Sequence, residues 1–439
     1  MPTPLYDALR QFAAQNPLRM HMPGHKGQPL PAPELAGMSS IDFTELPPTG
    51  NLYEAGEPFT SAQELWAKRF GFDYCQFLTG GSTMGIHTGL TLCCPTGSQV
   101  LVDRGCHRSV FHSMALLDLK PVYLERPWLE QEGITGPFFP NHVEKILDQH
   151  PDIKTVCITS PTYCGVLSDI SGLSRVIHAH GGKLMVDGAH GAHLPFLGVD
   201  AFAGADVVVV SAHKTLPAMG QSALLFVNGF DPSLVRQRAA LYGSSSPSYP
   251  MLASLDLARD YLEREGTGEY RRVAWRVAQL RKKFPSLGGN LPLDFCRLTI
   301  RAKDGPALTA RLEDMGIFPE MEDGGHVVFI LTCADSNADL DRLEQALEES
   351  RALLGSREVP LPPPPLPERV LSLRKALFAP SQVWPLEDCV GEIAACQVAP
   401  YPPGVPVIAP GERITKKELA YLQQIGYNIK SEIRTVLEL

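Results

Sequence analysis

Between about residue 60 and residue 230, short helical patterns alternate with short apolar runs. This alternation is typical of a mainly parallel β-sheet with helices on both faces, because parallel strands need a crossover between them. In such α/β sheets, ligands bind where the strands end. The expected helices are 61–70, 83–93, 107–117, 142–149 and 171–180. The expected strands are 99–103, 120–124, 154–159, 183–187, 206–210 and 222–227.

The flanking segments have different patterns. Residues 4–15 form an amphipathic pattern, and a long helical pattern covers about 250–284. A small α+β pattern follows, with strand 294–301, helix 306–315, strand 326–332 and helix 336–353. A stiff proline-rich connector occupies 360–367. The expected domains are an N-terminal helix and linker (1–60), a large α/β domain (61–285) and a C-terminal α+β region (286–439).

Composition excludes several classes of protein. The net charge is −9 and no long basic run occurs, which argues against nucleic acid or an anionic membrane as the main partner. No apolar stretch reaches the roughly 18 residues of a membrane span, and the N-terminus has no signal-peptide pattern. The ten scattered cysteines form no CxxC pair, so we expect reduced thiols and a cytoplasmic protein.

Two of the expected strands end in side chains that could take part in catalysis. The β-branched run from Asp206 ends with Ser211, His213 and Lys214, and the run 183–187 ends with Asp187. A lysine that is poorly solvated has a lowered pKa and becomes a nucleophile. An acid and a lysine at successive strand ends fit pyridoxal phosphate, which forms a Schiff base with lysine and is protonated on its pyridine nitrogen beside a carboxylate. A surface lysine after an edge strand fits the lysine segment equally well.

A glycine-rich turn offers a seat for a phosphate group. Residues 80–85, Gly-Gly-Ser-Thr-Met-Gly, lie between a strand and a helix expected to begin near Thr83. Glycines let backbone amides approach an anion, and the helix start adds positive potential. Ser82 or Thr83 could cap that helix, and Ser211 could reach the same phosphate. Alone, such a turn indicates helix capping only. Because the turn is followed along the chain by Asp187 and then Lys214, the three together favour a cofactor site.

Seven motifs in order resemble the bacterial ornithine/lysine/arginine decarboxylases, which are fold type I (aminotransferase-fold) pyridoxal phosphate enzymes. The motifs are His-Met-Pro-Gly-His-Lys-Gly at 21, Gly-Gly-Ser-Thr-Met-Gly at 80, Ser-Pro-Thr-Tyr-Cys-Gly at 160, Asp-Gly-Ala-His-Gly-Ala-His at 187, Ser-Ala-His-Lys-Thr-Leu at 211, Ser-Ser-Pro-Ser-Tyr at 245 and Tyr-Pro-Pro-Gly at 401. The resemblance is to a short form, without the extra N-terminal domain of the large inducible members.

The resemblance implies a role for each matched residue. Lys214 would carry the cofactor, Asp187 would pair with its pyridine nitrogen, and His107 and Ala189 would pack on opposite ring faces. The phosphate would be bound by Gly81, Ser82, Thr83, Ser211 and His213. His190 would also border the cofactor, where the larger members have a bulky aromatic residue. Lys214, His213, Asp187 and His107 would form the catalytic group. Glu320 would bind the distal cation of the substrate.

The resemblance also implies an activity and a partner. The reaction would be decarboxylation of a basic amino acid to an amine and CO2, as in polyamine biosynthesis. Arginine is favoured by analogy with other short members, and lysine and ornithine remain alternatives. Residues 245–249 would lie near the neighbouring subunit's cofactor, which implies a homodimer with its active site at the interface, or a dimer of dimers. The Cα proton donor stays open among Lys214, His213 and a nearby tyrosine or cysteine.

Two rival functions remain at this point. A fold type I lyase or aldolase would break a side-chain bond instead of releasing CO2. A metal-dependent hydrolase would use Asp187, His190 and His193, or the pair His21 and His25, as ligands. No further ligands occur at a fixed spacing, so the metal site is the less favoured alternative.

Overall fold

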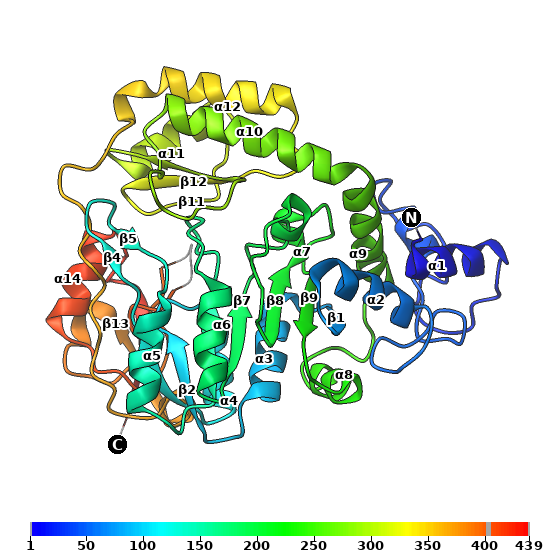
Figure 1. Cartoon of the computed structure of the whole chain (residues 1–439), viewed down its shortest axis with the longest axis horizontal. Coiled ribbons are helices and arrows are strands. Elements are labelled where there is room, and N and C mark those ends of the chain that lie inside the picture. Colours follow the sequence, from blue (N-terminus) through cyan, green and yellow to red (C-terminus); the bar gives the residue numbers. More distant parts are fainter. Residues whose placement is uncertain (1, 401–404, 438–439) are drawn as a thin grey trace. The chain divides into compact units, whose positions relative to one another are not determined.

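The computed structural model describes residues 2–400 and 405–437. These residues form two compact units that interleave along the chain (Figure 1). The first unit comprises residues 2–92, Met185–Arg272 and Thr332–Ala334, and the second comprises 93–184, Val273–Leu331, 335–400 and 405–437. The domain limits expected from the sequence at residues 60 and 285 stay a prediction. None of the helices in these described ranges is long and apolar enough to cross a membrane.

A seven-stranded sheet carries the fold, with the strand order β1-β9-β8-β7-β6-β2-β3. Its strands are β1 (Tyr74–Leu78), β2 (Gln99–Asp103), β3 (Lys120–Leu124), β6 (Thr155–Thr159), β7 (Lys183–Asp187), β8 (Val207–Ser211) and β9 (Ala223–Val227). β7 is parallel to β8, and β2 is parallel to both β3 and β6. β9 is antiparallel to both of its neighbours. The predicted mostly parallel α/β sheet is therefore confirmed.

The helices expected between residues 60 and 180 are all present within two residues of their predicted limits. In chain order, the α-helices are α1 (Pro4–Ala14), α2 (Phe59–Phe70), α3 (Gly81–Cys93), α4 (Arg108–Leu116), α5 (Pro140–Gln149), α6 (Ile170–Ala179), α7 (Ala212–Thr215), α8 (Pro232–Ala240), α9 (Tyr249–Tyr261), α10 (Thr267–Lys283), α11 (Gly305–Asp314), α12 (Asn337–Glu349), α13 (Leu373–Phe378) and α14 (Lys416–Gln424). A π-helical turn, Leu262–Gly266, joins α9 to α10 within the long helical segment predicted at 250–284.

Two glycines bring α3 unusually close to the sheet. A Cβ atom at Gly85 would lie 2.5 Å from Val209 Cγ1 of β8, and one at Gly89 would lie 2.7 Å from Met185 Cε of β7. The Gly85 contact is shorter than packed atoms tolerate, so this position requires glycine, whereas at Gly89 the nearest atom is the flexible end of Met185. The close approach packs α3 against the middle of β7 and β8.

The remaining strands belong to the second unit. β10 (Arg297–Arg301), β12 (His326–Ile330) and β11 (Met321–Glu322) form an antiparallel sheet in the order β10-β12-β11. β10 and β12 lie within the two predicted strands, whereas β11 was not predicted. Two antiparallel pairs were not predicted: β4 (Trp128–Leu129) with β5 (Ile134–Thr135), and β13 (Ser381–Pro385) with β14 (Glu432–Val436).

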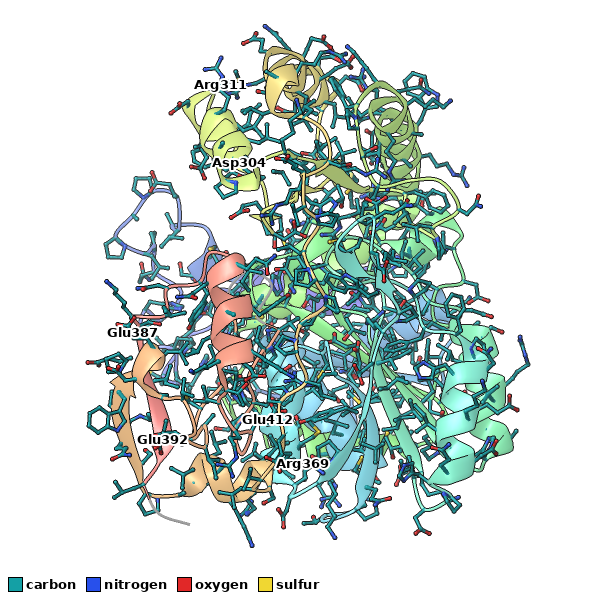
Figure 2. All side chains as sticks on the ribbon, turned by 90° about the vertical axis from the view of Figure 1, so that its left-hand side faces the viewer. Asp304, Arg311, Arg369, Glu387, Glu392 and Glu412 are labelled. Carbon is teal, nitrogen blue, oxygen red and sulfur yellow. The ribbon has the colours of Figure 1, made fainter. Side chains whose placement is uncertain are left out.

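A buried ion pair anchors the C-terminal segment that contains Glu412, which Figure 2 labels. Arg104 Nη2 lies 3.1 Å from Glu412 Oε2, and Glu412 is fully buried. Arg104 Nη1 also donates to the Pro406 carbonyl at 2.6 Å. These bonds tie the segment before Glu412 to the loop after β2. The preceding Tyr-Pro-Pro-Gly motif, 401–404, lies outside the described residues.

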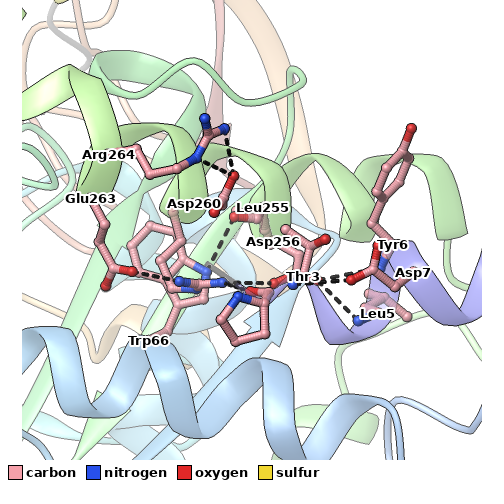
Figure 3. A network of polar contacts seen from close by, with 12 residues as sticks. Thr3, Leu5, Tyr6, Asp7, Trp66, Leu255, Asp256, Asp260, Glu263 and Arg264 are labelled. Carbon is pink, nitrogen blue, oxygen red and sulfur yellow. Dashed lines mark hydrogen bonds and ion pairs between the residues drawn. The ribbon is translucent and has the colours of Figure 1, made fainter.

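The N-terminal helix is fastened to α9 by buried charge (Figure 3). Asp256 Oδ2 accepts hydrogen bonds from the amides of Leu5, at 2.9 Å, and Tyr6, at 3.3 Å, and so caps α1. Arg259 is fully buried and pairs with Asp256 at 3.4 Å, with Glu263 at 2.6 Å and with the Pro2 carbonyl. Burial raises the pKa of Asp256 to about 6.

Candidate cofactor and substrate site

Strand register brings three predicted segments to one edge of the sheet. Ser211 at the end of β8 is opposite Ala223 of β9, which is in turn opposite Leu78 at the end of β1. Asp187 at the end of β7 pairs with Val209 of β8. The chain therefore leaves β1, β7 and β8 at the same edge, where an α/β sheet binds its ligands.

The glycine-rich turn follows β1 directly. α3 begins at Gly81, two residues earlier than expected, so Ser82 and Thr83 lie in its first turn and neither is its N-cap residue. The helix starts earlier because the Gly81 amide donates to the Gln221 carbonyl at 2.9 Å, which fixes the backbone at this residue. First-turn amides have no acceptor inside their own helix and carry partial positive charge. The amides of Ser82 and Thr83 thus present the groups that a phosphate requires, whereas the Gly81 amide already donates to Gln221.

Ser211 supplies an independent sign of a missing ligand. Its side chain is fully buried, and its Oγ has no hydrogen-bond partner among the described residues. A buried hydroxyl without a partner costs roughly 1–3 kcal/mol. A phosphate oxygen would satisfy this hydroxyl. Close by in sequence, His213 donates from Nδ1 to the Ser222 carbonyl at 2.9 Å, which fixes the orientation of its ring.

Lys214 lies in α7, within one turn of the end of β8. It is half-buried, and its Nζ is 3.1 Å from Nε2 of His190, which is 4% exposed. Because β8 lies inside the sheet, the alternative of a surface lysine after an edge strand is wrong. Asp187 is also buried and accepts a hydrogen bond from the Ala189 amide at 3.2 Å. These groups and the phosphate seat all belong to the first unit.

The second unit holds His107, which is the N-cap residue of α4. Its Nδ1 accepts a hydrogen bond from the Ser109 amide at 3.2 Å and lies 2.9 Å from Ser109 Oγ. The loop before His107 is held by Asp103, whose buried carboxylate accepts from the Gly105 amide at 2.8 Å and pairs with Arg126 at 2.7 Å. The sequence interpretation missed Asp103 and Arg126. An acid ending the apolar run of β2, as Asp187 ends β7, was the available signal.

Glu320 also belongs to the second unit, immediately before β11. Its side chain is exposed, and Oε1 accepts a hydrogen bond from the Tyr163 hydroxyl at 2.9 Å. Tyr163 follows β6 in the Ser-Pro-Thr-Tyr-Cys-Gly motif. The motif is part of the family resemblance, but the resemblance implied no role for this tyrosine.

The structure does not bring together the three residues expected as metal ligands. Among the described residues, Asp187, His190 and His193 do not form a cluster with ligand atoms within 4.8 Å of one another. The first two are instead hydrogen bonded to Ala189 and Lys214. His25 contacts Asp42 at 3.1 Å, which accounts for it as a loop contact.

A polar pocket in the second unit is lined by side chains that form ion pairs with one another. It is lined in part by Glu132, Arg301, Asp323 and His326. His326 is 4% exposed and lies 3.1 Å from Asp323 and 3.8 Å from Glu132. Burial alone would lower the pKa of His326, but the two carboxylates outweigh it and raise this pKa to about 9. The Arg301 hydrogen bond lowers the pKa of Glu132 to about 2.

This pocket predicts an alkaline loss of stability. A histidine whose pKa rises on folding stabilises the protein fully below its unfolded pKa of 6.5 and loses this contribution as pH rises through about 9. The shift corresponds to at most about 3 kcal/mol. Unfolding measured between pH 6.5 and 10 should show this decline, and His326→Asn should flatten it. An equal decline in His326→Asn would contradict the assignment, whereas His178→Asn, a substitution at an exposed histidine, should retain the decline.

Comparisons with known proteins point to one family. The family profile for the Orn/Lys/Arg decarboxylase major domain matches residues 3–300, and that for the Orn/Lys/Arg decarboxylase C-terminal domain matches residues 375–430. The chain is 33% identical to the Bacillus subtilis protein named "Uncharacterized protein YaaO", over 97% of this chain and 94% of that protein. It is 29% identical to the arginine decarboxylase of Bacillus anthracis, over 96% of this chain and 92% of that protein.

A solved structure shows the same fold. The Francisella novicida lysine decarboxylase superposes with a TM-score of 0.83 at 21% identity, covering 99% of this chain and 81% of that one. The predicted fold type I architecture is therefore confirmed. Since the major-domain profile alone covers more than half of the sequence, the chain belongs to the Orn/Lys/Arg decarboxylase family.

Proposed function

We propose that the protein is a pyridoxal phosphate-dependent decarboxylase that converts a basic amino acid, with arginine favoured, to its amine and CO2. The main support is that one edge of the sheet holds Lys214, Asp187 and the Ser211 hydroxyl, which is buried without a hydrogen-bond partner among the described residues. Arginine is favoured because a relative named arginine decarboxylase matches 96% of this chain at 29% identity, whereas the Escherichia coli constitutive lysine decarboxylase matches 87% of it at 24%.

The residues present fit the cofactor. Lys214 would hold it covalently, and the ionised carboxylate of Asp187 would face its pyridine nitrogen. The first turn of α3, Ser211 and His213 would bind its phosphate, and Ala189, His190 and His107 would border the ring. When bound, the protonated ring supplies an electron sink for the pair that remains on Cα as CO2 leaves.

His190 prepares the lysine for this role. Only a neutral amine is a nucleophile, so the Lys214 ammonium must first lose a proton. At 3.1 Å from Nζ, Nε2 of His190 is within reach to accept it. His213 is held through Nδ1 by the Ser222 carbonyl, which leaves Nε2 as its exchangeable site. We therefore assign proton transfer to this pair of histidines and Lys214.

We propose a second copy of the chain as the protein partner. The segment after α1 exposes apolar side chains that water solvates poorly, with Leu18 at 87% and Met20 at 82% exposed. A homodimer would cover such side chains, and the motif 245–249 implies that its active sites lie near the interface. The ten free cysteines fit a reducing compartment, which we take to be the cytoplasm.

The reaction is tested by its products. Purified protein supplied with pyridoxal phosphate should be screened against the twenty amino acids and ornithine, with CO2 release as the readout. We expect the highest kcat/KM for arginine, with agmatine as the co-product. Release of glycine or pyruvate without CO2 would favour the aldolase or elimination alternative. Absence of turnover with every basic amino acid would overturn the proposal.

A further inference from the structure

We infer that Tyr163 is a specificity-determining residue of the proposed reaction, because it positions the Glu320 carboxylate for the distal cation of a basic substrate. This inference rests on the proposed function and extends it to Tyr163, a residue to which the family resemblance gave no role. Its basis is the 2.9 Å hydrogen bond from the Tyr163 hydroxyl to Glu320 Oε1. The two residues are 157 positions apart in sequence, so folding alone brings them together.

Tyr163 is held on a tight turn after β6. The Thr162 amide donates to the Val166 carbonyl at 2.9 Å, and the Gly165 amide donates back to the Thr162 carbonyl at 2.9 Å. Thr162 Oγ1 also accepts from the Val166 amide at 3.1 Å. The turn is joined to β10, because Thr299 Oγ1 donates to the Cys164 carbonyl at 3.1 Å. The backbone that carries the phenol is therefore fixed on both sides.

Glu320 is fixed through a different strand. Its amide donates to the Val328 carbonyl at 2.9 Å, and the next residue, Met321, pairs with Val328 in the β11–β12 ladder. Within the described ranges, Tyr163 is the one donor to the Glu320 carboxylate. An exposed glutamate without this bond would sample several rotamers, and binding a cation would require one of them to be selected.

The chemistry of the pair suits a cationic ligand. A phenol hydroxyl donates one hydrogen bond, whereas an ionised carboxylate has about four acceptor positions. Tyr163 uses one of these on Oε1, so Oε2 remains available to a guanidinium or ammonium group. Because the phenol is neutral, it orients the carboxylate without cancelling its charge. The expected effect is therefore on binding of charged side chains, with little effect on the bond-breaking step.

A double-mutant cycle tests this inference. With arginine, or with the basic amino acid that wild type prefers, Tyr163→Phe should raise KM about 3–10-fold and leave kcat within about twofold, the size expected for one hydrogen bond to a partly solvated charge. In a Glu320→Gln background, Tyr163→Phe should add no further increase in KM. Citrulline, which is nearly isosteric with arginine but neutral, should inhibit wild type and Tyr163→Phe equally.

The controls separate positioning from general damage. Tyr74→Phe removes a comparable bond, from the Tyr74 hydroxyl to Gln76 at 2.8 Å, and should leave KM unchanged. Glu320→Asp keeps the charge but withdraws it from Tyr163, and should reproduce the KM increase even if Tyr163→Phe folds poorly. Independent effects of the two substitutions, or equal losses for arginine and citrulline, would overturn the inference. Wild type that is inactive with all basic amino acids would instead overturn the proposed function.

Discussion

Lys214→Ala is expected to abolish turnover and to remove the visible absorbance that pyridoxal phosphate shows when joined to a lysine. The half-buried amine at the end of β8 is the group at the sheet edge that can attack an aldehyde, and it is already within 3.1 Å of a proton acceptor. Alanine keeps the short helix α7 but removes the nucleophile. Absorption spectra and CO2 release measured on the same preparation check both expectations.

The covalent assignment has a direct chemical test. Borohydride reduction of the wild-type protein, followed by digestion, should yield a pyridoxyl group on the peptide that contains residue 214. A label on any other lysine would contradict the assignment. Lys303→Ala is the matched control, because this lysine is exposed and donates to the Ala352 carbonyl at 3.0 Å. It should retain both colour and turnover.

Arg259→Met is expected to destabilise the protein by about 3–5 kcal/mol, the cost of leaving a buried charge without its partner. Arg259 is fully buried and neutralises Asp256 and Glu263 while holding the Pro2 carbonyl. Its loss would leave Asp256 ionised in an apolar environment while that carboxylate still caps α1. Thermal or urea unfolding near pH 7.5 measures the change.

A neighbouring arginine provides the control for this experiment. Arg264 pairs with Asp260 at 2.7 Å, but its side chain is 49% exposed, so Arg264→Met should cost about 0–1 kcal/mol. Acid should reduce the difference in unfolding free energy between Arg259→Met and wild type. Burial raises the pKa of Asp256 to about 6 while Arg259 opposes this rise, so removing Arg259 should raise the pKa further, and protonation of Asp256 should recover more stability in the variant than in wild type. Equal destabilisation by both substitutions would contradict the buried-charge account.

The fold was largely predictable because its sheet has a strong periodic signal. β8 and β9 are runs of apolar residues that are buried throughout, which a sequence shows directly. β1 was less visible because its buried run includes Gln76, a polar residue that is fully buried. β13 was missed since it is largely exposed and ends in Pro385, a combination that resembles a loop.

The site was predictable where its residues end strands and unpredictable where loops meet. Lys214 and Asp187 come at the ends of apolar runs, so their common sheet edge follows from sequence, while their chemistry stays a prediction. Tyr163 and Asp103 act through contacts with Glu320 and Arg126, residues from distant segments. One sequence without relatives does not reveal such pairings. His190 illustrates the same limit, because its contact with Lys214 depends on how two strands lie side by side.

The glycines at 85 and 89 have a consequence for evolution of the anion seat. Gly85 lies one turn beyond Gly81, so a methyl group there is expected to push the helix from the sheet and move its N-terminal amides outward. Affinity for the phosphate of the proposed cofactor would then fall although every residue proposed to contact it is intact. A substitution at Gly85, or a larger one at Gly89, is therefore expected to change how tightly the proposed cofactor is retained.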